Sequence, residues 1–73
     1  MPKLPVLSGA EVIRAMERLG FTRARQKGSH VVLRRGGTGC VVPLHREIKT
    51  GTLAGIIRQA QLTQDEFLGA LAQ

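Results

Sequence analysis

The chain contains 73 residues, of which 42% are hydrophobic and 22% are charged, and its formal net charge at pH 7 is +6. A chain of this length folds around one core, and this composition is typical of a folded rather than a disordered protein. The positive charge favours a polyanionic partner, and the short length argues against a metabolite enzyme with an enclosed pocket.

Cysteine content and hydropathy indicate the cellular environment. Cys40 is the only cysteine, so an internal disulfide is excluded and we expect a reducing, cytoplasmic location. The N-terminal lead, residues 1–7, contains two prolines and a lysine where a secretory signal would be apolar. No window reaches the roughly 18 apolar residues of a membrane span, so we expect neither a targeting segment nor a membrane partner.

Capping motifs and apolar spacing predict three helices. Residues 8–11 have the S-x-x-E spacing of a capping box and begin the first helix, which Gly20 ends. Apolar residues at helical spacing over 53–60 predict the second helix, after a polar connection at 45–49. Residues 63–66 repeat the capping-box spacing and begin the third helix.

Three runs of alternating or β-branched residues predict strands, at residues 21–27, 30–35 and 40–44. Gly28-Ser29 makes a tight turn between the first two strands, and residues 36–39 make the next turn. Pro43 places the third strand at a sheet edge, or itself at a strand end. We therefore predict an α+β fold of order α-β-β-β-α-α, in which helices cover one face of a three-stranded antiparallel sheet.

No cofactor is predicted. The two histidines and the cysteine have no spacing that binds zinc, so we predict no metal site. The glycine run at 36–39 joins strand to strand, which indicates a hairpin turn rather than a phosphate-binding loop ahead of a helix. Cys40 begins an apolar strand and is most simply a core residue, with a reactive thiol as the alternative.

His30 directly follows the Gly28-Ser29 turn and is the main candidate for chemistry. Along its strand, Val31 and Leu33 share one face, whereas His30, Val32 and Arg34 share the other. Because the first pair is the more apolar, we expect it to face the helices and His30 to face solvent.

A basic surface is expected around this histidine. The register leaves open which pair of first-strand side chains lies beside it, Arg23 and Arg25 or Thr22 and Gln26. Lys27 and Arg35 are expected at the rim. Phe21 and Phe67 are the only aromatic residues and are expected in the core, so an RNA partner would be recognised by its backbone and shape.

Histidine and cations together suit RNA cleavage. The reaction needs a base for the ribose 2′-OH, cations for the charge on phosphorus and an acid for the leaving 5′-oxygen. An imidazole titrates near pH ~6.5 and can transfer a proton at neutral pH. His45, at the exit of the third strand, is a secondary candidate.

Alternatives stay open on this reasoning. From composition alone, an ordinary surface histidine is the simpler interpretation of His30. A non-catalytic RNA-binding module would use the same charge and fold without cleaving RNA. A pure protein-interaction domain would need neither His30 nor the basic face.

Motifs along nearly the whole chain resemble the HicA (YcfA-like) family of mRNA interferase toxins. They are Leu4-Pro5, Ser8-Gly9, Gly20-Phe21, Gln26-Lys27-Gly28-Ser29-His30, Val42-Pro43-Leu44-His45, Glu47-Ile48-Lys49, Gly51-Thr52-Leu53, Ile56-Ile57-Arg58-Gln59-Ala60 and Asp65-Glu66-Phe67-Leu68. The most specific feature is the order of Gly-Ser-His, Val-Pro-x-His and Gly-Thr-Leu.

The resemblance implies one domain over residues 1–73 with a fold like that of a double-stranded-RNA-binding domain. It implies the toxin of a type II toxin-antitoxin system, a metal-independent endoribonuclease that cleaves mRNA and is paired with a HicB-type antitoxin. The family pattern makes His30 the catalytic residue, and His45 matches its second histidine. The residues expected to bind RNA are Lys27, Gly28, Ser29, Arg34 and Arg35. We expect a monomer when the toxin is free.

One position departs from the family pattern. Gln61 stands where the family usually has glycine between the last two helices. A left-handed turn at this position would be less favourable for glutamine than for glycine.

Overall fold

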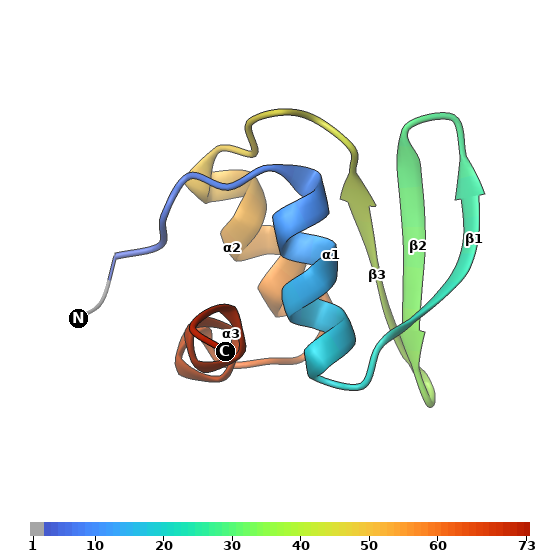
Figure 1. The fold of residues 1–73 in the computed structure, drawn as a ribbon. Coiled ribbons are helices and arrows are strands. Elements are labelled where there is room, and N and C mark those ends of the chain that lie inside the picture. Colours follow the sequence, from blue (N-terminus) through green and yellow to red (C-terminus); the bar gives the residue numbers. More distant parts are fainter. Residues whose placement is uncertain (1–2) are drawn as a thin grey trace.

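The computed structural model describes residues 3–73. Residues 1 and 2, which begin the predicted N-terminal lead, lie outside the described residues. The elements in chain order are α1 (Gly9–Arg18), β1 (Thr22–Lys27), β2 (His30–Arg35), β3 (Thr38–Pro43), α2 (Thr50–Gln59) and α3 (Gln64–Leu71) (Figure 1). This order confirms the predicted α+β fold.

Two capping boxes begin helices α1 and α3, as predicted. The Ser8 hydroxyl accepts a hydrogen bond from the Glu11 N–H at 3.2 Å, and the Glu11 carboxylate accepts one from the Ser8 N–H at 3.0 Å. Thr63 and Glu66 repeat this exchange at 3.1 and 2.8 Å. Each box satisfies backbone donors that the first helical turn would otherwise leave unpaired. Gly20, with φ of 93°, follows the end of α1 in the left-handed conformation.

The three strands form one antiparallel sheet in the order β1-β2-β3. Strand β3 begins at Thr38, which pairs with Arg35, so the turn before it consists of Gly36 and Gly37 only. The predicted turn over 36–39 is therefore wrong. Gly36 adopts φ of 59°, which allows a two-residue hairpin, and the β-branched Thr38 can then join the strand.

A β-bulge in β1 changes which side chains share a face. The register shifts between Arg23 and Arg25, and Ala24 is the extra residue. The facing pairs are Arg23 with Leu33, Arg25 with Val32 and Gln26 with Val31. Arg23 and Arg25 therefore lie on opposite faces, and so do Thr22 and Gln26. Both pairings predicted beside His30 are wrong, because the bulge interrupts the alternation that the prediction assumed.

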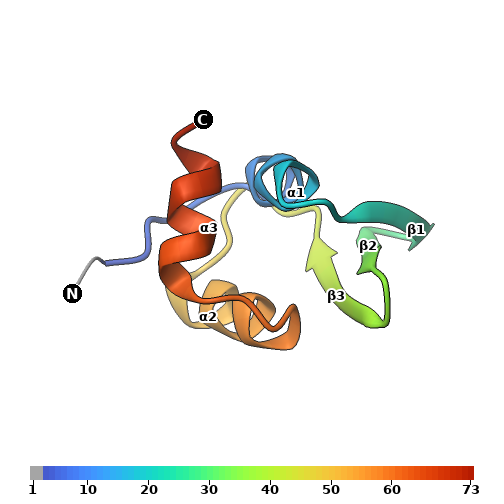
Figure 2. The same ribbon diagram turned by 90° about the horizontal axis from the view of Figure 1, so that it is seen from below.

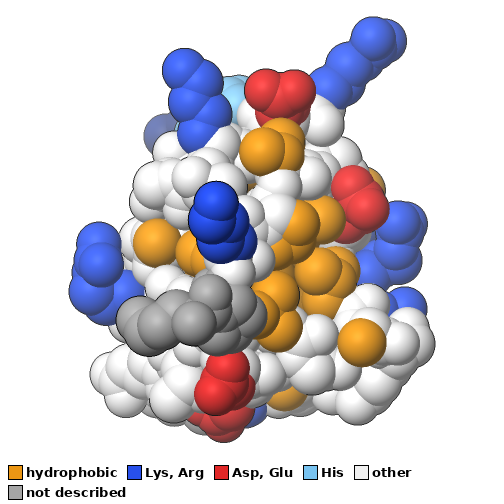
Figure 3. All heavy atoms as spheres, turned by 90° about the vertical axis from the view of Figure 1, so that its left-hand side faces the viewer, with side chains coloured by type: hydrophobic (Ala, Val, Ile, Leu, Met, Phe, Trp, Pro, Cys, Tyr) orange, Lys and Arg blue, Asp and Glu red, His pale blue; other side chains and the backbone are white. Residues whose placement is uncertain are grey.

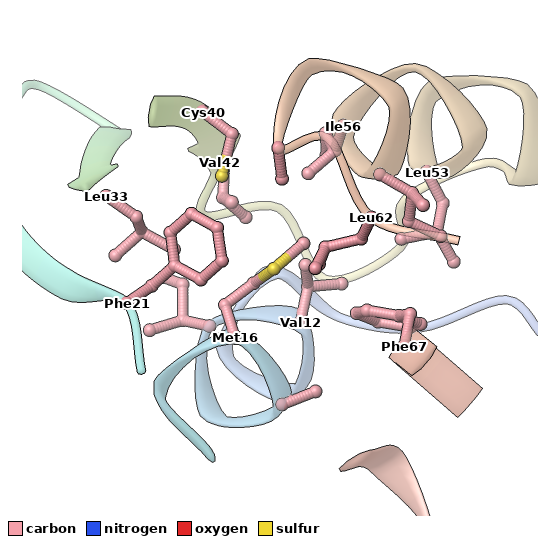
Figure 4. Packing of buried hydrophobic residues seen from close by; sticks show 14 of the residues in the cluster. Val12, Met16, Phe21, Leu33, Cys40, Val42, Leu53, Ile56, Leu62 and Phe67 are labelled. Atoms are coloured by element: carbon pink, nitrogen blue, oxygen red, sulfur yellow. The ribbon is translucent and has the colours of Figure 1, made fainter. Parts of the chain in front are cut away.

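The helices cover one face of the sheet, as predicted. The buried side chains of that face are Val31, Leu33, Cys40 and Val42. They pack with the apolar sides of the helices and with Phe21, which is 2% exposed and lies just before β1 instead of in it (Figure 4). Phe67 on α3 is fully buried, so both aromatic residues belong to the core.

Strand β1 extends beyond this core. All six of its residues are exposed, and it lies at the side of the molecule farthest from the helices (Figures 1 and 2). Burial thus ends at β2, and the outer strand has solvent on both faces. A three-stranded sheet in so short a chain has too few helices to cover its full width.

The connection between β3 and α2 is only partly polar. Ile48 is 2% exposed, and its N–H donates to the Leu7 carbonyl at 2.6 Å across an isolated antiparallel bridge. The predicted polar connection at 45–49 is therefore wrong at Ile48, which joins the core. A single apolar residue in a loop has no periodic pattern that would predict its burial.

Gln61 adopts φ of 58° between α2 and α3, so the left-handed turn forms without glycine. The turn allows the Leu62 N–H to donate to the Ile57 carbonyl at 3.1 Å and places Leu62 against the core. Glutamine therefore adopts here a left-handed conformation that is more favourable for glycine.

Candidate functional site on the open face of the sheet

His30 is the first residue of β2 and lies on the open face, the side of the sheet turned away from the helices. It is exposed, whereas its neighbour Val31 points the other way and is fully buried. Across the sheet it pairs with Lys27 on β1 and with Pro43 on β3. Gly28 adopts φ of 59° at the first position of the preceding turn, where a two-residue hairpin favours glycine.

Hydrogen bonds to backbone carbonyls hold the His30 segment on both sides. The Leu44 N–H donates to the Ser29 carbonyl at 2.6 Å, which extends the β2–β3 pairing beyond the last strand residue. On the β1 side, the side-chain amide Nε2 of Gln26 donates to the Gly28 carbonyl at 2.9 Å. The imidazole is therefore exposed to solvent, while hydrogen bonds on both sides hold the backbone that carries it.

The N-terminus of α1 rests against the end of β3. The Gly9 N–H donates to the His45 carbonyl at 2.9 Å. A Cβ at Gly9 would overlap the Pro43 carbonyl oxygen and stand 2.9 Å from the Leu44 Cα, so this close approach requires glycine. The contact joins α1 to the segment whose backbone also holds Ser29.

His45 lies two residues beyond β3, at the same end of the sheet as His30. Its side chain is exposed, and its backbone carbonyl is fixed by Gly9. The structure thus brings both sequence-predicted histidines to one end of the molecule and leaves both imidazoles accessible.

The cations of the open face lie at different distances from His30. Lys27 faces His30 directly, whereas Arg34 is four residues farther along β2, about 13 Å away at the usual rise of a strand. The Arg34 side chain lies beside the surface of Gly39, where a Cβ would stand 3.6 Å from its Cγ. Arg25 lies between Lys27 and Arg34 along the sheet, because the bulge places it beside Val32.

Arg35 lies on the opposite face of the sheet from the other predicted RNA-binding residues. Its guanidinium carbon is 4.8 Å from the centre of the Phe21 ring, and its Nη1 donates to the Leu19 carbonyl at 2.8 Å. These contacts attach β2 to the C-terminal end of α1. Strand alternation already separates Arg35 from His30, because the two residues are five positions apart, an odd number that puts them on opposite faces of the sheet.

Charge is distributed unevenly between the sheet and the helices. The strands contain no carboxylate and five cations, Arg23, Arg25, Lys27, Arg34 and Arg35. The helical side, seen in Figure 3, instead has an apolar area with both cations and carboxylates around it. Three of these cations, Arg25, Lys27 and Arg34, are on the open face, which therefore has a positive field that favours binding of a polyanion.

A small apolar strip crosses the open face. Val32 on β2 is half-buried and pairs with Val41 on β3, which is 37% exposed. Leu44, 38% exposed, follows at the end of β3, where alternation turns it away from the open face. Strand alternation predicted the open position of Val32. The exposure of Val41 and Leu44 was not predictable, because a run of apolar residues does not show which of its faces meets solvent.

The structure assigns Cys40 to the core. The side chain is 2% exposed, and burial raises the pKa of its thiol to about 11. A protonated thiol is neither a good nucleophile nor a metal ligand, so the core interpretation is confirmed.

Over residues 3–73, no group of three histidine, cysteine or carboxylate side chains is placed to bind a metal ion. Within the same range, no helix has the length and hydropathy to cross a membrane.

Comparison with known proteins identifies the family. A family model for the HicA toxin of bacterial toxin-antitoxin systems matches residues 9–62, which include the sheet, His30 and His45. No match was found among curated proteins. The observed α+β architecture agrees with the fold of this family, which is like that of double-stranded-RNA-binding domains. The chain therefore belongs to the HicA family of toxins, whose place in toxin-antitoxin systems implies an antitoxin partner.

Proposed function

We propose that this toxin is an endoribonuclease that cleaves mRNA by internal attack of a ribose 2′-OH, without a metal ion. The observation that carries the proposal is His30, an exposed imidazole on a fixed backbone, facing Lys27 on a sheet with no carboxylate. Translation takes place in the cytoplasm, so an mRNA substrate entails a cytoplasmic location.

In this mechanism His30 transfers the proton, as general base at the 2′-OH or as general acid at the leaving 5′-oxygen. Lys27, directly across the ladder, neutralises the charge that develops on the phosphorus. Gly28 has open space where a Cβ would stand, which leaves room for RNA to approach the turn at Gly28 and Ser29. His45 is the candidate for the complementary proton transfer.

Arg34 contacts a different phosphate in this proposal. At about 13 Å from His30 along the strand it would hold the backbone away from the cut site. Arg35 is not part of the proposed interface, because it lies on the other face and is engaged with Phe21 and Leu19. Recognition by cations and backbone, without exposed aromatic side chains, predicts weak sequence preference.

The decisive experiment compares wild-type protein with His30→Ala on a defined RNA in excess chelator. We expect the variant to lose about 10²- to 10⁴-fold in cleavage rate, with an unchanged melting temperature because the side chain is exposed. The products should carry 2′,3′-cyclic phosphate ends, and a single 2′-deoxy substitution at the cut site should stop cleavage without preventing binding.

His45→Ala tests the second histidine in the same assay, since it removes the other exposed imidazole from this end of the sheet. If this variant loses one limb of the pH–rate profile, the complementary proton transfer is assigned to His45. Binding of RNA without cleavage by the wild type would favour the non-catalytic module. Cleavage that requires added Mg²⁺ and leaves 5′-phosphates would contradict the mechanism.

We further propose that the antitoxin is an acidic, HicB-type protein that covers the open face. The face combines cations with the apolar pair of Val32 and Val41, which suits a protein partner better than RNA alone. Charge pairing would set the association rate, and burial of His30 would set inhibition. An equimolar antitoxin should protect RNA completely; a complex that leaves His30 accessible and still cuts RNA would overturn this masking.

A further inference from the structure

The two edges of the sheet differ in how they are protected. At β3, the Val41 N–H donates to the Gln59 side chain at 3.1 Å, and α2 packs alongside the strand. At β1, all six residues are exposed, and among the described residues no side chain hydrogen-bonds to the backbone of this strand. An unprotected edge offers N–H and C=O groups to an additional strand.

The hairpin geometry indicates which backbone groups point outward. A two-residue turn closes on a hydrogen-bonded pair, here Lys27 and His30, so the N–H and C=O of Lys27 point toward β2. The groups of the preceding residue, Gln26, then point away from β2 to the open edge. The bulge at Ala24 limits regular pairing to the part of β1 nearest the turn.

The charge of the edge selects the kind of strand that fits it. Arg25 and Lys27 point to the open face and Arg23 to the helical face, so cations stand on both sides of the edge. Among the described residues, Arg23 is the one cation of this edge with a carboxylate within 4 Å, that of Glu17 at 3.9 Å. Both side chains are about half-exposed, which makes this ion pair weak. A second copy of the chain would place like charges against each other, which is unfavourable across strands.

We propose that the outer edge of β1 binds an acidic, extended segment of a protein partner, which adds to the sheet as a fourth strand. Main-chain hydrogen bonds at Gln26 supply the affinity, and alternating carboxylates on the segment meet Arg25 and Lys27 on the open face. The site is the edge and not the open face, so it stands whether or not His30 cleaves RNA.

The test uses a synthetic ten-residue peptide of alternating glutamate and valine, with binding followed by anisotropy and by amide chemical shifts of the full-length protein. We expect the largest shifts in β1 and a dissociation constant that rises with salt. The same peptide with N-methyl groups on alternate residues keeps its charge but cannot form the ladder, and we expect about tenfold weaker binding.

A pair of variants tests the same site from the protein side. Gln26→Pro removes the outward N–H, which an edge strand tolerates, and should weaken peptide binding about tenfold. Gln26→Ala is the matched control, because it also loses the side-chain bond to Gly28 but keeps the N–H, and should bind as the wild type does. If Gln26→Pro fails to fold, binding of the N-methylated peptide to the wild-type protein still tests whether the backbone of β1 forms the ladder.

Three outcomes would overturn the proposal. Equal binding of the N-methylated peptide would reduce the interaction to charge alone. Shifts in β1 produced equally by oligouridylate would make nucleic acid the occupant of the edge. Self-association of the wild type through β1, without peptide, would make a second copy the occupant.

Discussion

Gly9 is the residue at which one missing atom permits a tertiary contact. A Cβ there would overlap the Pro43 carbonyl oxygen, so Gly9→Ala must push α1 away from the end of β3. We expect a loss of about 1–3 kcal/mol in the free energy of unfolding, as for other overpacked sites. Thermal melting of the variant measures this loss.

The matched control is Gly69, an α3 glycine around which an added Cβ meets no atom within 4 Å. Gly69→Ala should stabilise the protein by about 0.5–1 kcal/mol, because alanine favours a helix over glycine. Opposite changes in the free energy of unfolding for the two glycine-to-alanine variants would separate the effect of the tertiary contact from that of helix propensity. Equal stabilisation by both would show that α1 does not press on β3.

Gln61 is a second residue whose backbone conformation can be tested. Its φ of 58° disfavours any side chain, so Gln61→Gly should relieve the turn. Glycine also gains freedom in the unfolded state, and we expect a net increase of about 0.5–1 kcal/mol in the free energy of unfolding. Gln61→Ala keeps the unfavourable side chain and should show no such gain. A destabilised glycine variant would mean that the glutamine side chain stabilises the turn by other contacts.

At the scale of elements, the two capping boxes make stability depend on acid. A hydrogen bond from the Ser8 backbone N–H lowers the pKa of Glu11 below 4.5, and the Thr63 backbone N–H does the same for Glu66. In each pair, the hydroxyl of the capping residue lowers the pKa by a smaller amount. The unfolded chain therefore takes up these protons first. The stabilisation is present above about pH 4.5 and is lost as pH falls through the lower pKa values of the folded state.

We expect the melting temperature to fall as the pH is lowered below about 4.5. The double variant Glu11→Gln/Glu66→Gln should show a smaller fall over the same pH range. Glutamine can still accept the N-cap hydrogen bond, so the variant should remain folded at pH 7. Melting curves at half-unit pH steps measure both slopes. An identical slope in the variant would assign the acid sensitivity to other carboxylates.

Element order was predictable because local signals agreed with the tertiary structure. The capping boxes at Ser8 and Thr63 and the turn at Gly28 each act within four residues, and the structure keeps all three. Features that depend on distant contacts were not predictable. The bulge at Ala24 and the burial of Ile48 have no local pattern, since both depend on what the strand or loop packs against.

The candidate site shows the same division. Alternation along β2 placed His30 and Arg34 on the open face, as observed. Arg35 was grouped with them by charge, although its position in the pleat and its contacts with Phe21 and Leu19 put it on the other side. Charge in a sequence does not distinguish a cation that binds a ligand from one that fastens two elements.

At the scale of the whole molecule, these two kinds of cation predict different responses to mutation. Arg34→Gln should reduce the dependence of log affinity for RNA on log salt by about one phosphate contact and leave melting unchanged. Arg35→Gln should leave that dependence unchanged and cost about 1 kcal/mol of stability, because its contacts are to Leu19 and Phe21. Salt titrations of RNA binding, paired with melting curves, measure both. The reverse pattern would place RNA on the helical face of the sheet.

The Gly36-Gly37 hairpin lies at the end of the sheet opposite His30, about 20 Å away at six residues of strand rise. Neither glycine would bring a Cβ within 4 Å of another atom. This turn is therefore a natural place to insert a reporter peptide or to open the chain for circular permutation, since loop tips tolerate both. A tag placed there would follow the protein in cells without crowding its histidines.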